Sequence, residues 1–148
     1  MFTRCSTMAA TLLLVPLTAG AQAPPALVAS QAWVREAPAS RPTSAAYLVL
    51  ENTSAADLTV VSASTPAARV VELHEMREED GKMRMRKVEK LVVPASGRIE
   101  LKPGGLHVML FELTGALEAG KTVPFTFTLA DGSTLKVDAE VRAGGGMR

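Results

Sequence analysis

The sequence predicts an all-β domain, folded as a sandwich or a small barrel, and three observations carry this prediction. After the first two dozen residues, apolar and polar side chains alternate over short stretches, as they do in strands with one buried face. Turn-forming residues interrupt the alternation about every ten positions, a spacing typical of all-β domains. The third observation is that no window has a convincing helical period.

The alternation predicts nine strands. They span residues 31–35, 47–52, 58–63, 69–78, 82–90, 97–101, 106–113, 123–130 and 133–142. Asp80-Gly81 and Asp131-Gly132 can adopt the positive φ angles of tight hairpins, and Pro103-Gly104-Gly105 ends one strand before the next begins. We expect residues 37–43 to form a loop and residues 143–148 to form a flexible glycine-rich tail.

Residues 1–21 have the pattern of a secretory signal peptide. A basic residue precedes an apolar stretch at residues 8–17, and small residues follow it. This stretch is about half the length that a membrane-spanning helix needs, so we expect no permanent anchor. Cleavage after Ala21 or after Ala23 fits the small-residue rule, and we favour Ala21 because the later cut leaves a proline at the new N-terminus. Residues 22–148 would then form a single domain.

Charge and cysteine content exclude several functions. The chain has 16 basic and 15 acidic residues and no run of five like charges, which disfavours binding to nucleic acid or anionic lipid. Signal cleavage would remove the one cysteine, Cys5. The mature domain then has no disulfide, thiolate zinc site, iron–sulfur cluster or cysteine nucleophile. Because no Gly-x-Ser-x-Gly motif or acid–base carboxylate pair is present either, we do not expect an enzyme.

The two histidines, His74 and His107, are each followed two positions later by a methionine, Met76 and Met109. Residues i and i+2 of a strand project from the same face, so each pair offers two ligands on one side. A two-residue turn in the first hairpin would place Met85 opposite Met76 and diagonal to His74. The strand that carries His107 need only pack nearby to complete a four-ligand site.

Two imidazoles with two or more thioethers form a soft, uncharged ligand set, which selects Cu(I) over hard cations. Zinc prefers thiolate, imidazole and carboxylate ligands, and a blue-copper centre normally contains a cysteine thiolate. The set therefore favours carrying copper over transferring electrons.

Two alternatives to a copper carrier stay open at this point. Each methionine taken alone is most simply a flexible core residue, and each histidine an ordinary hydrogen-bonded one. On that interpretation the protein is an exported β-sandwich that works as an interaction or assembly module without a metal. A mononuclear copper oxidoreductase is a third candidate, which we rank last because methionine-rich sites resist oxidation to Cu(II). The coincidence of two His-x-Met pairs with a facing hairpin favours the metal site.

The spacing of these residues resembles a known signature. Ten residues separate His74 from Met85, twenty-one separate Met85 from His107, and one separates His107 from Met109. This is similar to the His-x10-Met-x21-His-x-Met motif of the periplasmic PCuAC copper chaperones. The segments VELHEM, MRMRKVEKLVVPASG and ELKPGGLHVMLFEL also resemble that family, and the resemblance covers residues 33–142.

The resemblance implies a cupredoxin-like, Greek-key β-sandwich with a Cu(I) site formed by the four motif residues. Met76 lies outside the minimal motif and would be a spare, auxiliary ligand. The resemblance further implies export to the bacterial periplasm and delivery of copper ion to the CuA centre, in subunit II of cytochrome c oxidase, often alongside a Sco-type thiol protein. These roles rest on analogy with the family.

Overall fold

The computed structural model describes residues 26–144, which contain ten strands and no helix. The strands are β1 (Leu27–Arg35), β2 (Thr43–Asn52), β3 (Leu58–Ser64), β4 (Ala68–Glu79), β5 (Lys82–Lys87), β6 (Leu91–Val93), β7 (Arg98–Leu101), β8 (Leu106–Leu113), β9 (Thr122–Leu129) and β10 (Thr134–Arg142). The all-β prediction is confirmed. The predicted signal peptide and most of the predicted tail lie outside the described residues. Within the described part, no helix is long and apolar enough to span a membrane.

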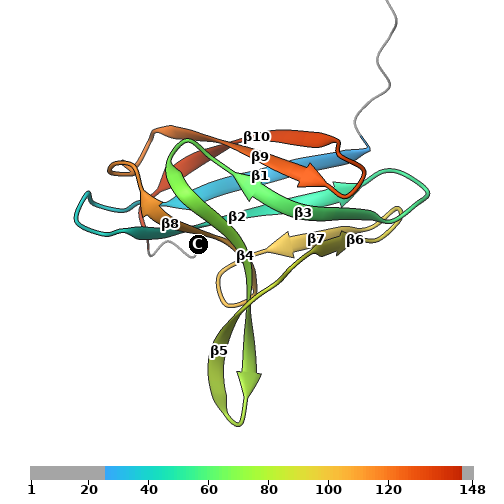
Figure 1. Ribbon diagram of the computed structural model, residues 1–148, viewed down its shortest axis with the longest axis horizontal. Helices are drawn as coiled ribbons and strands as arrows, with labels where there is room; N and C mark the ends of the chain where they lie inside the picture. Colours follow the sequence, from blue (N-terminus) through green and yellow to red (C-terminus); the bar gives the residue numbers. More distant parts are fainter. Residues whose placement is uncertain (1–25, 145–148) are drawn as a thin grey trace, which may run out of the picture.

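The strands form one mixed sheet in the order β5-β4-β8-β2-β1-β10-β9-β3-β6. The pairing of β1 with β10 is parallel, and the other pairings are antiparallel. The long strand β2 pairs with β8 through its first half and with β7 through its second half. Figure 1 shows β9, β10 and β1 stacked above β2 and β8, with the end of the β4–β5 hairpin extending away from the body.

Alternate residues of the central strands build the core. Val123, Phe125, Phe127 and Leu129 of β9 are buried, and they pack in one cluster with residues that include Leu110 of β8. Burying an apolar side chain of this size stabilises the fold by about 1.5–3 kcal/mol. Neighbouring strand residues point to opposite faces of the sheet. Because Val108 and Leu110 of β8 point into the core, His107 and Met109 point to the other face.

The β4–β5 hairpin has the register that the sequence predicts. Glu79 pairs with Lys82, and Met76 pairs with Met85. The turn residues Asp80 and Gly81 have φ angles of 53° and 73°, which are those of a two-residue type I′ turn. All six residues of β5 are exposed.

The predicted strand at 82–90 is wrong at its end, because β5 stops at Lys87 and β6, at Leu91–Val93, is a separate strand that the sequence does not predict. The N–H of Val88 donates to the carbonyl of Leu73 at 2.8 Å, which is the last bond between this segment and β4. The chain then turns inward, and Leu91 and Val93 are buried where β6 pairs with β3. The alternation of apolar and polar residues gives no sign of the break, so nine strands are predicted and ten are observed.

Three smaller differences have local causes. The first strand is predicted to begin at residue 31, whereas β1 begins at Leu27. A bulge at Gln31, with a φ of 52°, interrupts the alternation of side chains, but the residues before it still pair with β2. β2 begins at Thr43, inside the predicted loop. In the predicted turn at 131–132, Gly132 alone has a positive φ. The carboxylate of the preceding Asp131 instead accepts hydrogen bonds from the backbone and hydroxyl of Ser133.

Candidate metal centre

The five residues that the sequence predicts as ligands come from three adjacent strands and share one face of the sheet. The antiparallel register of β4 and β8 places His74 directly opposite His107, and their ring centroids are 5.9 Å apart. Met76 and Met109 each follow a histidine by two positions, but the strands are antiparallel, so the two methionines lie on opposite sides of the histidine pair. Met109 is opposite Glu72, and Met85 of β5 is opposite Met76. Strand alternation therefore gives all five side chains the same orientation relative to the sheet.

A groove of about 360 Å³ runs along this face. Met76, Met85, His107 and Met109 are among the residues that line it. The remaining lining residues are Arg35, Arg41, Thr43, Ser44, Ala45, Tyr47, Pro103 and Gly104. His74 is 9% exposed and is not among the lining residues. The groove therefore gives a ligand direct access to the thioethers and to one imidazole, while the second imidazole is more deeply placed.

A backbone carbonyl orients the His107 ring. Nδ1 of His107 lies 3.0 Å from the carbonyl oxygen of Gly105. A carbonyl oxygen can only accept a hydrogen bond, so Nδ1 carries the proton and Nε2 holds the lone pair. The same Gly105 oxygen accepts the backbone N–H of Met76 at 3.1 Å. The Gly105 carbonyl therefore contacts both the His107 ring and the backbone of β4, and it fixes one relative to the other.

A carboxylate orients the His74 ring. Nε2 of His74 lies 2.9 Å from Glu72 Oε2, and Lys87 Nζ lies 3.0 Å from the other carboxylate oxygen. The hydrogen bond from His74, and after it the one from Lys87, hold the pKa of the Glu72 carboxyl below its ordinary value. The ionised carboxylate can only accept, so His74 Nε2 carries the proton and Nδ1 holds the lone pair.

The lone pair of His74 is unusual because Nδ1 is buried and has no hydrogen-bond partner among residues 26–144. Buried polar atoms are nearly always paired, and one without a partner requires an explanation. In metal sites, a ligating histidine donates its other ring N–H to a carboxylate or a carbonyl. His74 and His107 both have this arrangement, with one nitrogen held by an acceptor and the other left for a ligand.

Aromatic rings flank the two imidazoles. The Tyr47 ring lies 6.4 Å from that of His107, and the Phe111 ring lies 5.8 Å from that of His74. Trp33 packs on Tyr47 at 4.5 Å and extends the row of rings across β1, β2, β8 and β4. These aromatic neighbours pack beside the imidazoles and limit the space in which the rings can turn.

The charged side chains that line the groove are Arg35 and Arg41. Lys87 lies opposite His74 on the adjacent strand, where it forms an ion pair with Glu72. Across the described residues, no three His, Cys, Asp or Glu side chains form a group that could hold a metal ion. Apart from the Glu72 carboxylate, which is held by His74 and Lys87, the donors that the proposed ligands bring to this face are imidazole nitrogens and thioether sulfurs.

Several residues of the site are not predicted from the sequence. Glu72 and Gly105 hold the imidazoles, and Tyr47 and Phe111 flank them. Glu72 and Gly105 each precede a histidine by two positions, just as a methionine follows each histidine by two positions. The spacing therefore places Glu72 and Gly105 on the same strand face as the histidines. The aromatic neighbours come from pairings between distant segments, which the sequence pattern does not specify.

Comparisons with known proteins give a consistent result. The family model described as "Putative lipoprotein LpqE-like" matches residues 27–141. A protein of Leifsonia xyli subsp. xyli, "Putative lipoprotein Lxx21020", is 35% identical over 149 residues, which span 94% of this chain and 89% of the relative.

Two solved structures have the same fold. The solution structure of CuI-DR1885 from Deinococcus radiodurans is 38% identical to this chain, has a TM-score of 0.63, and covers 85% of this chain and 84% of its own. The copper-bound PCuAC domain from PmoF2 is 18% identical and has a TM-score of 0.68, with coverage of 82% of this chain and 97% of its own. The cupredoxin-like fold prediction is confirmed.

Proposed function

Because the chain belongs to the LpqE-like family of PCuAC-type domains, we propose that it is a copper chaperone whose cargo is one Cu(I) ion. The proposed ligands are His74, Met85, His107 and Met109, with Met76 as an auxiliary ligand. The relative in Deinococcus radiodurans has a structure named as its CuI form, which supports the choice of cargo.

The observation that carries this proposal is the state of the two imidazoles. Each has one nitrogen held by an acceptor, and the other has a lone pair without a partner in the described residues. The rings face each other across a strand pair, and thioethers follow each of them on the same face. A soft monovalent cation matches this donor set.

The charge of the surroundings also favours the monovalent ion. The proposed ligands are uncharged, while Arg35 and Arg41 line the groove. Coulomb repulsion from these cations doubles when the charge of the metal rises from one to two. Oxidation of bound copper to Cu(II) is therefore opposed both by the soft ligands and by the neighbouring charges.

The exposure of the ligands suggests how the ion is transferred. Met85 is 48% exposed, whereas His74 and His107 are 9% and 5% exposed. An incoming acceptor can replace the outer thioether first, while the imidazoles retain the ion until the exchange is complete. Transfer by ligand exchange leaves copper as Cu(I) throughout, and the protein acts as a carrier rather than an enzyme.

We place this function in the periplasm and propose the CuA centre of cytochrome c oxidase as the destination, reached alongside a Sco-type thiol protein. The signal-peptide pattern of residues 1–21 supports export, with residues 22–148 as the mature domain. The description of the family as lipoproteins also supports export. Delivery would be tested by mixing the copper-loaded protein, a reduced Sco-type protein and the apo CuA domain, and then treating the product with a one-electron oxidant. Loading of two Cu(I) ions per CuA site predicts that this oxidation produces the visible spectrum of the mixed-valence centre.

The test of the copper site is an anaerobic competition titration with a chromophoric Cu(I) chelator. We expect His107→Ala and Met109→Leu each to weaken Cu(I) binding by well over about tenfold. Met109→Leu keeps the apolar volume and removes only the sulfur. Val92→Ala, which alters an exposed apolar residue of β6, is the control and should bind as the wild type does.

Thermal unfolding provides a second readout, because a ligand that binds only the folded form raises the melting temperature. Equal affinities of the wild type and both site variants would reject the ligand assignment. A melting temperature that does not respond to Cu(I) would instead support a metal-free interaction module.

A further inference from the structure

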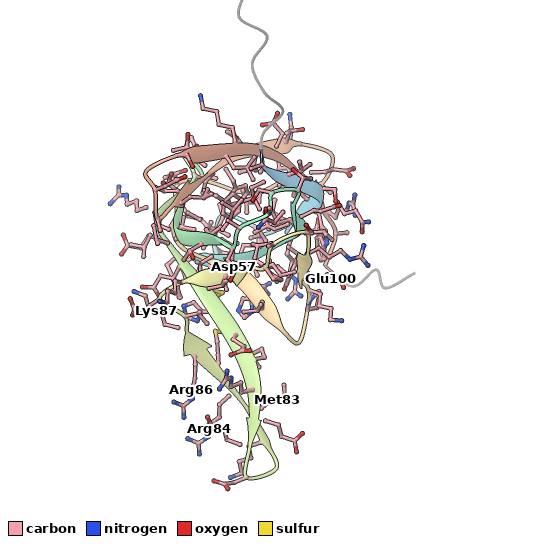
Figure 2. The ribbon with its side chains drawn as sticks, turned by 90° about the vertical axis from the view of Figure 1, so that its right-hand side faces the viewer. Asp57, Met83, Arg84, Arg86, Lys87 and Glu100 are labelled. Atoms are coloured by element: carbon pink, nitrogen blue, oxygen red, sulfur yellow. The ribbon has the colours of Figure 1, made fainter. Side chains whose placement is uncertain are left out.

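A group of thioethers continues along the β4–β5 hairpin beyond the proposed copper site. Met83 lies two positions from Met85 on β5, so both project from the same face, and Met76 lies opposite Met85 on β4. Met83 is 54% exposed and Met85 is 48% exposed. Figure 2 labels Met83 on the part of the hairpin that extends from the body.

The hairpin register brings these three side chains within reach of one another. The backbone N–H of Met76 donates to Gly105, on the β8 side of the strand, so Met76 and Met85 form a non-hydrogen-bonded pair across β4 and β5. In such pairs the side chains approach most closely, with Cβ atoms about 4.5–5.5 Å apart. Met83 is the diagonal neighbour of Met76, at about 7–8 Å, a distance that flexible thioethers can bridge.

The opposite face of the hairpin has a different character. Arg86 forms a 2.6 Å ion pair with Glu79, and Arg77 forms one of the same length with Glu75. Strand alternation therefore places these two ion pairs on one face and the thioethers on the other. The thioether face also contains Glu78, opposite Met83, and the Lys87–Glu72 ion pair next to His74.

The exposure of this thioether face argues against a role in packing. Methionine is used in cores because it fills irregular gaps, but all of β5 is exposed and the end of the hairpin extends away from the body. An aliphatic or polar residue would serve a solvent-exposed strand equally well. The exposed Met83 and Met85, together with the half-buried Met76 opposite Met85, instead form a ligand set for a soft monovalent cation.

We propose that Met76, Met83 and Met85 form a thioether-only capture site for Cu(I) at the outer hairpin. Met85 belongs to both sites, so the ion can pass inward by exchanging Met83 and Met76 for the imidazoles and Met109. Each step exchanges one neutral donor for another, and copper remains Cu(I). The carboxylate of Glu78 on the same face attracts the incoming cation. This inference rests on the proposed function, whose cargo it shares.

The first experiment measures uptake in the wild type and in Met83→Leu, which removes the sulfur and keeps the apolar volume. Anaerobic stopped-flow mixing with a Cu(I)–chelator complex gives the rate, and competition gives the affinity. We expect uptake to slow by at least about threefold while the affinity stays within about twofold. Arg84→Gln, on the opposite face of the same strand, is the matched control and should leave both values unchanged.

The second experiment removes the inner site with His74→Gln/His107→Gln and follows ¹³C-labelled methionine methyl groups by NMR during Cu(I) titration. We expect the Met83, Met76 and Met85 methyl signals to shift together. If this double variant does not fold, the uptake rates of the singly substituted hairpin variants decide the question alone.

The outcomes separate the two proposals. A wild-type protein that does not bind Cu(I) refutes the proposed function. Tight binding by the wild type with an unchanged uptake rate in Met83→Leu overturns the capture site and leaves the proposed function standing. A Met83 methyl signal that does not move in a folded double histidine variant also overturns the capture site.

Discussion

Replacing Glu72 by alanine should weaken Cu(I) binding even though Glu72 is not a proposed ligand. Its carboxylate accepts the hydrogen bond from His74 Nε2 at 2.9 Å, which directs the lone pair to Nδ1. Without this acceptor, the ring loses both its fixed tautomer and its orientation. Loss of such a supporting partner typically reduces metal affinity by about 10–100-fold, and we expect Glu72→Ala to fall in that range.

Glu72→Gln gives a graded comparison, because the amide oxygen can still accept the bond but carries no charge. A charge-assisted hydrogen bond is about twice as strong as a neutral one, so the logarithm of the affinity loss should be about half that of Glu72→Ala. Lys87→Ala removes the second partner of the carboxylate and leaves the bond to His74, so its effect should be smaller than either.

The assay is the anaerobic Cu(I) competition titration, repeated at several pH values. The pKa of Glu72 is lowered by its hydrogen bonds from His74 and Lys87, so the carboxylate contributes at neutral and mildly acidic pH and loses its effect only as the pH falls through that lowered value. The ratio of wild-type to Glu72→Gln affinity should therefore stay constant across the neutral range. Wild-type affinity in Glu72→Ala, together with a loss in His107→Ala, would refute this account of the His74 ring.

Three further predictions concern the framework. Leu110→Ala, at a fully buried position on the core side of β8, should lower the free energy of unfolding by about 3 kcal/mol in urea denaturation, and a loss under about 1 kcal/mol would indicate that the core collapses around the site. Gly81→Ala should destabilise the hairpin by about 1 kcal/mol, because the φ of this residue is 73°. No heavy atom lies within 4 Å of an added Cβ, so the cost comes from the backbone conformation and not from a clash. Unchanged amide exchange in β5 would contradict this prediction. The hydrogen bond from Arg86 lowers the pKa of Glu79, so the ion pair stabilises the hairpin above the ordinary glutamate range and is lost as the pH falls through the lowered value. In Arg86→Ala, an NMR titration should show the pKa of Glu79 moving up, and an unchanged midpoint would refute the pairing.

The hairpin shows how far local rules extend. A two-residue turn at 80–81 fixes the pairing of every residue behind it, so the sequence predicts that Met76 lies opposite Met85, and the structure confirms this register. The same reasoning is wrong about where the hairpin strand ends. The break after β5 depends on β6 pairing with β3, and a local pattern contains no information about that distant partner.

The opposition of the two histidines lies beyond local rules. His74 and His107 are brought together by the pairing of β4 with β8, and the intervening chain includes three other strands. The sequence predicts only that these strands pack nearby, and the convergence of the four ligands follows from the family resemblance. Glu72 and Gly105 illustrate the same limit, because a same-face position is visible in the sequence but the hydrogen bond to a particular ring nitrogen is not.

The sequence by itself determined the all-β class, the hairpin register and the chemical nature of the donors, because side-chain alternation, turn geometry and ligand softness depend only on neighbouring residues and on residue type. The tertiary structure decided which imidazole faces which, which nitrogen of each ring is left with a lone pair, and which thioethers are exposed to an approaching partner. Those properties depend on pairing between distant strands and on burial, and both are set by the packing of the whole chain.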